Sequence, residues 1–359
     1  MWPIIFCLFV VFLFVLPLLP GLVELRFATD TKPLSVIQEY NTDITYFAKG
    51  FKTYLEKNFI SFFSAEQKLN VPIQQGILRD NTNFQIIRNR TIPVFNLQEI
   101  SRAKTDWLII ADSALILPGQ IFFQKEIYSR NSISAGENSQ FRALLAEENI
   151  TLGKGCSILR WVHSGGSLFV DPNCNLYGRA SAGSSITLSK RCVFERLHAP
   201  KIMFGKSQPV AAGRKKIHEL LKVTTIPNVK DQYTRRWLID GDIEIPENSF
   251  FDGDLIASRN VVIGAGSHIR GSIKSNNDLQ LQNNVQVDGS VVSTGNLYIG
   301  NNCNLSGPVI AEDTIFIETG STVGTETAQT TVSGLKIHIA SGVVVFGSVW
   351  AEESARVAS

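Results

Sequence analysis

The chain of 359 residues lacks the short motifs that mark the common catalytic and metal-binding folds. It contains no Cys-x-x-Cys, no Gly-x-x-x-x-Gly-Lys-Ser/Thr, no Gly-x-Ser-x-Gly and no His-Glu-x-x-His. Zinc fingers, P-loop nucleotide-binding proteins, α/β-hydrolases and zinc proteases thereby lose their main sequence signal. Five cysteines in a chain of this length do not make a disulfide scaffold. We therefore expect no catalytic residue, no metal ion and no cofactor.

Charge is also scarce, and neither sign dominates. Charged residues make up 18% of the chain, and 34 Lys and Arg against 32 Asp and Glu give a formal net charge of +2. This balance excludes a globally basic nucleic-acid-binding protein and an acidic disordered chain. Hydrophobic residues make up 44% of the chain, which is enough to build a large core.

The first segment is a candidate membrane anchor. Residues 1–23 carry no charged side chain, and a helix needs about 20 apolar residues to cross a bilayer. The segment lacks the basic start and the Ala-x-Ala-like site of a cleaved signal peptide. We predict an uncleaved transmembrane anchor over residues 1–25 and a single-pass membrane protein. Arg26 and Lys32 follow the anchor, so the positive-inside rule places the bulk of the chain in the cytoplasm.

An amphipathic helical segment is predicted over residues 30–70. Its apolar residues are spaced by three and four, as on one face of a helix. Three roles stay open for this segment: packing on its own domain, a short coiled coil, or a helix on the membrane surface. Residues 71–114 have a mixed pattern of apolar and polar residues, and we predict that they form a connecting region or a cap. The apolar stripe consists of Ile37, Tyr40, Ile44, Phe47, Phe51 and Tyr54.

An eighteen-residue repeat runs through the rest of the chain. Gly253, Gly271, Gly289 and Gly307 are each 18 residues apart, and four apolar columns keep the same step. Repetition of this kind is the signature of a solenoid. The repeat continues upstream, and we count eleven coils, which start near residues 115, 133, 150, 168, 186, 243, 261, 279, 297, 315 and 337.

Each coil contains a finer period of six residues, three short strands separated by three corners. Alternation of apolar and polar residues indicates the strands, and Gly and Asn cluster where corners need a positive φ, as in Gly300-Asn301-Asn302. The sequence thus predicts an all-β main domain, a triangular parallel β-helix (solenoid) of about 18 residues per coil, preceded by a transmembrane helix and an amphipathic α-helix. We assign residues 115–204 to a first β-helix block, 241–351 to a second block and 352–359 to a tail.

A basic insertion separates the two blocks at residues 205–240. Residues 206–236 contain eight basic and two acidic side chains, a net charge of 8 − 2 = +6. The insertion is either a solvated loop or a contact for anionic lipid headgroups or an acidic partner. Nucleic acid is an unlikely partner because no stacking pattern accompanies the charge. The expected contact residues are Arg214, Lys215, Lys216, Lys222, Arg235 and Arg236.

The cysteines and histidines have plain structural interpretations. Cys156, Cys174, Cys192 and Cys303 share one inward column of the repeat, which predicts a core ladder of small side chains. The histidines stand in no recognisable motif. An enzymatic alternative would need one of His163, His198 and His218 as a base.

The second block resembles the bactofilins, polymer-forming bacterial cytoskeletal proteins. The residues that carry the resemblance are the recurring elements Gly253-Asp-Leu-Ile-Ala, Gly271-Ser-Ile-Lys-Ser, Gly289-Ser-Val-Val-Ser and Gly307-Pro-Val-Ile-Ala. The resemblance implies a right-handed triangular β-helix, end-to-end polymerisation without nucleotide, and a scaffold role. The long membrane-anchored N-terminal region and the basic insertion depart from the family's pattern.

The leading hypothesis is a membrane-tethered, non-enzymatic scaffold in cell shape or envelope organisation, with copies of itself or envelope-synthesis proteins as partners. A β-helix exposes unpaired strand edges at its ends, and no capping helix follows the last coil. We therefore expect the C-terminal end to be the polymer or partner contact, with Val343, Val345, Phe346 and Val349 near it.

Two alternatives remain open. The first is an acyl- or acetyltransferase of the hexapeptide-repeat kind, which shares the six-residue period and would use the insertion as its loop over acyl-CoA. The second is binding of anionic lipid or polysaccharide.

Overall fold

The computed structural model describes residues 44–63, 72–88, 92–93, 95, 102–205, 220–223 and 226–358, together with residues 2, 5, 6, 9, 12 and 16. These residues belong to two compact units, Met1–Asp43 and Ile44–Ser359. Most of the predicted anchor lies outside the described residues. Among those described, no helix has the length and apolar character needed to cross a bilayer. Trp2, Ile5, Phe6, Phe9 and Phe12 are helical, with exposed side chains.

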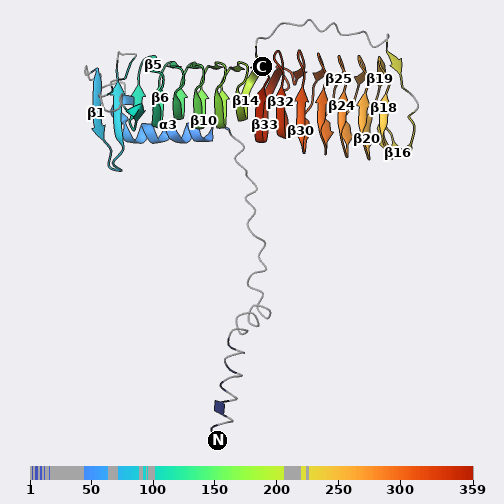
Figure 1. The fold of residues 1–359 in the computed structure, drawn as a ribbon, viewed down its shortest axis with the longest axis horizontal. Coiled ribbons are helices and arrows are strands. Elements are labelled where there is room, and N and C mark those ends of the chain that lie inside the picture. Colours follow the sequence, from blue (N-terminus) through green and yellow to red (C-terminus); the bar gives the residue numbers. More distant parts are fainter. Residues whose placement is uncertain are drawn as a thin grey trace. The chain divides into compact units, whose positions relative to one another are not determined.

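The second unit is a parallel β-solenoid of about 13 turns with about 18 residues per turn (Figure 1). Three parallel ladders wind through it, and each coil gives one strand to each ladder. In one coil, for example, Leu255 pairs with Ile273, Val261 with Leu279, and Phe251 with Ile269. The predicted β-helix and its period are confirmed.

The first block starts earlier than its repeat predicts. Residues 71–114 contain a strand at the end of the rod and strands that pair in parallel with the next coil, so this region belongs to the solenoid. The strands of the block are β1 (Ile73–Ile77), β2 (Asn83–Ile87), β3 (Lys104–Thr105), β4 (Leu108–Ala111), β5 (Leu115–Leu117), β6 (Phe122–Ser129), β7 (Ile133–Ala135), β8 (Gln140–Ala146), β9 (Ile150–Leu152), β10 (Ser157–Ser164), β11 (Ser167–Val170), β12 (Asn175–Ala182), β13 (Ser185–Leu188) and β14 (Val193–Phe204).

The second block also extends beyond the boundaries expected for it. Its first strands lie within the predicted insertion, and the predicted tail belongs to its last strand. The strands are β15 (Leu221–Lys222), β16 (Val229–Tyr233), β17 (Arg236–Ile239), β18 (Ile243–Ile245), β19 (Ser249–Phe251), β20 (Asp254–Ala257), β21 (Val261–Ile263), β22 (His268–Ile269), β23 (Ile273–Ser275), β24 (Leu279–Leu281), β25 (Gln286–Val287), β26 (Val291–Ser293), β27 (Leu297–Ile299), β28 (Asn304–Leu305), β29 (Val309–Ala311), β30 (Thr314–Ile317), β31 (Thr322–Val323), β32 (Thr330–Ile339) and β33 (Val344–Val357).

One corner of each coil needs a left-handed residue. Asn284 and Asn302 have φ values of 59° and 56° there, and Gly266 and Gly320 take 68° and 78° in neighbouring coils. Asn and Gly accept this conformation at the lowest cost. The clustering of these residues in the sequence is thereby explained.

The column of glycines at 18-residue spacing has a different cause. Gly289 and Gly307 do not have positive φ; instead, each lies against the backbone of the preceding coil. A Cβ on Gly289 would come within 2.5 Å of Ser272 Oγ and 2.6 Å of the Gly271 carbonyl group. The parallel stacking distance of about 4.8 Å leaves no room for a side chain at this point.

A helix covers one sheet of the first block. The predicted amphipathic segment forms α3 (Tyr46–Asn58), followed by the short α4 (Ile60–Phe63). The buried side chains of Leu55, Phe59 and Phe62 pack on the outward residues of β2, β4, β6, β8 and β10. Phe51 lies 5.6 Å from the Trp161 ring. Of the three roles left open, packing on its own domain is the one observed for residues 44–63; residues 30–43 and 64–70 of the predicted segment lie outside the described residues.

We predict that Gly289→Ala destabilises the unit by roughly 1–3 kcal/mol, because the added methyl group forces adjacent coils apart. The measurement is urea unfolding followed by circular dichroism. Gly50→Ala is the matched control: Gly50 lies in α3 with nothing within 4 Å of an added Cβ, so it should gain about 0.5–1 kcal/mol. Equal effects of the two substitutions would contradict the close-approach explanation.

Candidate contact surfaces at the junction and the ends

The two blocks meet at their C-terminal ends. β33, the last strand of the chain, pairs antiparallel with β14, the last strand of the first block. In Figure 1 the first block runs inward from β1 to β14, and the second block runs inward from β16 to β33. We expected a free C-terminal end beyond Val349; in the structure the chain itself occupies this end.

The junction is hydrogen-bonded on all three sides of the solenoid. On one side Arg191 N donates to Val357 O (3.1 Å) and Val357 N to Cys192 O (2.9 Å). On the second side the strands pair directly, with Leu197 opposite Val349 in the β14–β33 ladder. On the third, Phe204 N donates to Val343 O at 3.0 Å. The strand edges that end each block are thereby satisfied by the other block.

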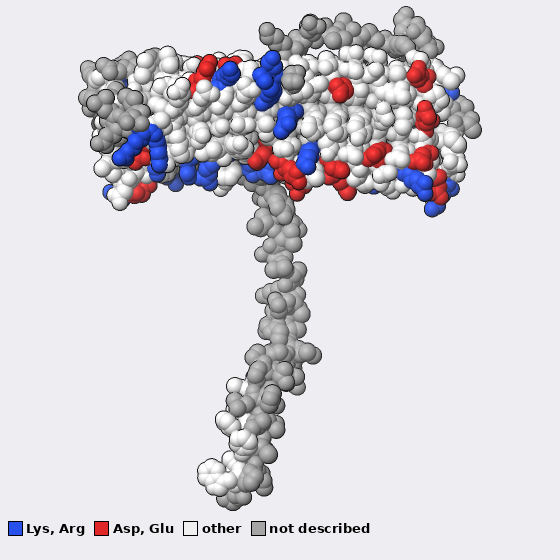
Figure 2. All heavy atoms as spheres, in the orientation of Figure 1, with Lys and Arg blue, Asp and Glu red and all other residues white. Residues whose placement is uncertain are grey.

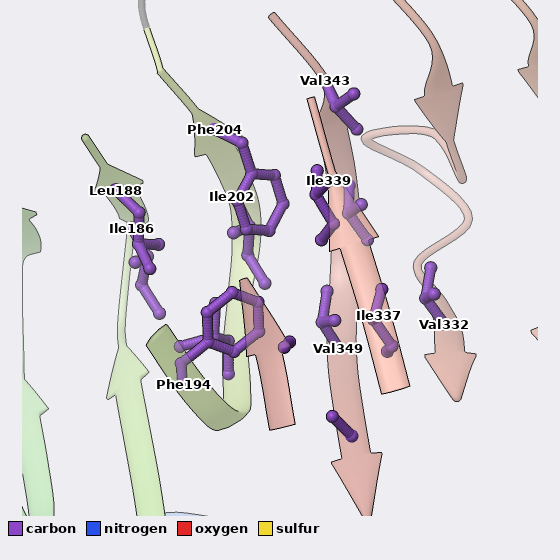
Figure 3. Close-up of a cluster of buried hydrophobic side chains, with 14 of the residues drawn as sticks. Ile186, Leu188, Phe194, Ile202, Phe204, Val332, Ile337, Ile339, Val343 and Val349 are labelled. Carbon is purple, nitrogen blue, oxygen red and sulfur yellow. The ribbon is translucent and has the colours of Figure 1, made fainter. Parts of the chain in front are cut away.

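The hydrophobic core continues through the junction without a break. Figure 3 shows Phe194, Ile202 and Phe204 of the first block facing Val343 and Val349 of the second. The rings of Phe194 and Phe204 stack with centroids 5.8 Å apart. The expected polymer contacts lie here, inside one chain: Val343 and Val345 are 0% exposed, Val349 1% and Phe346 9%.

Side chains also join the two blocks on the outer surface. His198 Nδ1 lies 3.0 Å from Ser348 Oγ, and the Arg196 guanidinium lies 4.5 Å from the centre of the Trp350 ring. Each pair has one member on β14 and one on β33. The junction is therefore fixed in register by polar contacts as well as by its core.

We predict that Val349→Asp separates the blocks, because a carboxylate at this position would be buried without a partner. A protease site placed within residues 206–219 of the full chain allows a direct measurement. After cleavage, the two parts of the parent protein should co-elute in size-exclusion chromatography, and those of the variant should separate.

Ile310→Asp is the matched control for this substitution, since Ile310 lies on the second block with its side chain 40% exposed. Its cleaved parts should remain together. If the Val349→Asp parts also remain together, the junction does not hold the blocks as described.

The outer end of the second block carries part of the predicted basic surface. Lys222 and Arg236 are exposed on β15 and β17. Arg235 forms an ion pair with Asp252, which also pairs with Arg270. Hydrogen bonds from Arg270 and the nearby Arg235 charge lower the pKa of Asp252. The other predicted contacts, Arg214, Lys215 and Lys216, lie outside the described residues.

Both outer ends finish in an antiparallel strand. β1 pairs only with β2, and β16 pairs with β17. Their outer edges carry exposed apolar side chains, Ile77 (67% exposed) and Tyr233 (61%). No described strand pairs with the outer edge of either one.

The cysteine column is a core ladder, as predicted. All four thiols are buried, and each donates to a carbonyl of the preceding coil at 3.0–3.2 Å. Burial raises the pKa of Cys303 to about 11, so this thiol is a poor nucleophile at neutral pH. Within the described ranges, no three His, Cys, Asp or Glu side chains converge as metal ligands would.

Two of the three histidines considered for the enzymatic alternative, His163 and His198, lie on the outer face of the first block. His163 Nδ1 is 2.8 Å from Ser181 Oγ, and His198 reaches Ser348; His218 lies outside the described residues. Three shallow hollows of about 330–490 Å³ open on the surface, and no histidine lines any of these three.

Comparison of the chain with models of protein families, with curated proteins and with solved structures found no match. The resemblance to bactofilins rests on the repeat residues alone and stays a prediction.

Proposed function

We propose that this protein is a non-enzymatic scaffold, tethered to the membrane by residues 1–25, that assembles or docks partners through the outer ends of its β-solenoid. The observation that carries the proposal is the antiparallel pairing of β14 with β33. This pairing joins the C-terminal ends of the two blocks to each other within one chain. Both ends that remain are N-terminal ends of β-helix blocks, each finished by an edge strand.

Edge strands are the natural contacts of such a rod. An unpaired row of backbone N–H and C=O groups is a template for another strand. On β1 the exposed Ile77 and on β16 the exposed Tyr233 add apolar surface beside these groups. A partner strand, from a second copy or from an envelope protein, would extend the sheet and cover these side chains.

The proposal revises the contact surface expected from the sequence. Phe346 and Val349 serve the internal junction, and the outer ends take over the role expected of them. Membrane attachment through the N-terminal segment, a mainly cytoplasmic chain and a role in cell shape or envelope organisation are retained as parts of the proposal. They are supported by the uncharged N-terminal segment and by the bactofilin-like repeat.

We expect the full chain, purified in a neutral maltoside detergent without nucleotide, to form end-to-end assemblies visible by negative-stain electron microscopy. The double variant Ile77→Asp/Tyr233→Asp should reduce them to single rods, because a charge beside each edge opposes strand pairing. Phe169→Asp is the control, since Phe169 is 44% exposed on β11, which pairs with β9 and β13 on its two sides and so lies along the rod, away from its ends.

Assemblies that persist in the end variant and disappear in the Phe169 control would place the contact on the side of the rod. Absence of assemblies in the parent chain would count against self-assembly.

A further inference from the structure

Three arginines form a row on the outer surface of the first block, close to the junction. Arg160 lies on β10, Arg179 on β12 and Arg196 on β14. The backbone register places Arg179 opposite Trp161 in one neighbouring coil and Arg196 in the other. Arg179 and Arg196 are thus separated by one coil, about 4.8 Å, and Arg160 is the residue before Trp161 on β10.

Aromatic rings hold two of these guanidinium groups. Arg179 lies 4.8 Å from the centre of the Phe47 ring, and Arg196 lies 4.5 Å from that of Trp350. In the part of the chain that the structure describes, none of the three arginines forms an ion pair. Elsewhere on the rod, Arg142 and Arg270 pair with carboxylates. Stacking fixes the direction of a guanidinium while leaving its N–H donors available.

The row of arginines lines a hollow of about 330 Å³. Its apolar wall is formed by Phe47, Leu159 and Trp161. The one carboxylate in the lining is Glu195, whose Oε2 accepts a hydrogen bond from Gly178 N at 3.1 Å. Three arginines against one glutamate give the hollow a net charge of 3 − 1 = +2.

The surface beyond Arg196 has the opposite charge. Arg196 also borders the next hollow, whose other charged lining residues, Glu312 and Glu352, belong to the second block beside Trp350. Figure 2 shows basic side chains along the lower edge of the first block and mostly acidic ones next to them on the second. An anion approaching this face is therefore drawn to the first block and repelled by the second.

We propose that this hollow is a binding site for a phosphate group carried on a partly apolar molecule. Arginines one coil apart can each donate two N–H groups to one phosphate, the geometry that guanidinium groups favour. The wall of Phe47, Leu159 and Trp161 would contact the organic part of the ligand. A phospholipid headgroup and a free phosphate ester share this chemistry. None of the residues that line the hollow belongs to residues 205–240 or to the outer strands β1 and β16.

The test is the thermal unfolding of the full chain in neutral maltoside micelles with three probes: micelles doped with phosphatidic acid, micelles doped with phosphatidylcholine, and soluble glycerol phosphate. Phosphatidic acid should raise the unfolding temperature and phosphatidylcholine should not. The double variant Arg179→Gln/Arg196→Gln should bind about tenfold more weakly or worse, since each charge-assisted hydrogen bond contributes substantially.

The matched control is Arg259→Gln/Lys274→Gln, which removes two exposed positive charges from the second block. It should leave the response unchanged. If phosphatidic acid alone raises the unfolding temperature, and the rise depends on the arginines, the ligand is a lipid headgroup. If glycerol phosphate raises it as well, the ligand is a free phosphate ester. Either result supports the site. The proposal is overturned if no probe raises the unfolding temperature of the parent chain, or if both double variants lose the rise to the same extent.

Discussion

The antiparallel pairing of β14 with β33 is the interaction on which the rest of the molecule depends. A solenoid coil satisfies its backbone groups only through the coils on either side, so a terminal coil needs a partner or a cap. Here the two C-terminal ends act as partners for each other. One rod with a continuous core results, although the chain runs in opposite directions along its two halves. The pairing also decides which surfaces are available for other molecules, because it leaves the N-terminal ends of the two blocks, which include β1 and β16, at the outside.

The same requirement for closely stacked coils explains the small residues of the repeat. Gly289 has no side chain because the previous coil lies against it. Asn302 turns the chain at a left-handed corner. Directly after that corner, Cys303 points inward and donates to the carbonyl of Gln282 in the coil before. Ser321, one coil later, makes the equivalent bond to Gly300. These positions serve the stacking of coils, so their cysteines need no redox or catalytic explanation.

Much of this architecture could be predicted from the sequence because each coil repeats the same physical demands. The columns at Gly289 and Leu297 give the period, and the stripe from Phe47 to Tyr54 gives the helix. The direction in which the second block meets the first could not be predicted. A column of inward-facing residues has the same composition whether the next coil is parallel or antiparallel. The periodicity therefore does not reveal the direction in which the two blocks meet. The burial of Val349, the row of arginines beside Phe47 and the roles of β1 and β16 all depend on this tertiary arrangement.

The central claim is that β14 and β33 of one chain lie side by side, with residue 198 opposite residue 348. Directly opposite residues of an antiparallel pair are close enough for a disulfide. The most direct measurement is therefore mild oxidation of His198→Cys/Ser348→Cys followed by mass spectrometry, with Ser181→Cys/Ser348→Cys, one coil further apart, as the control. We predict an intrachain disulfide in the first variant and none in the control. Free thiols in the first variant, or a disulfide found only between chains, would contradict the account.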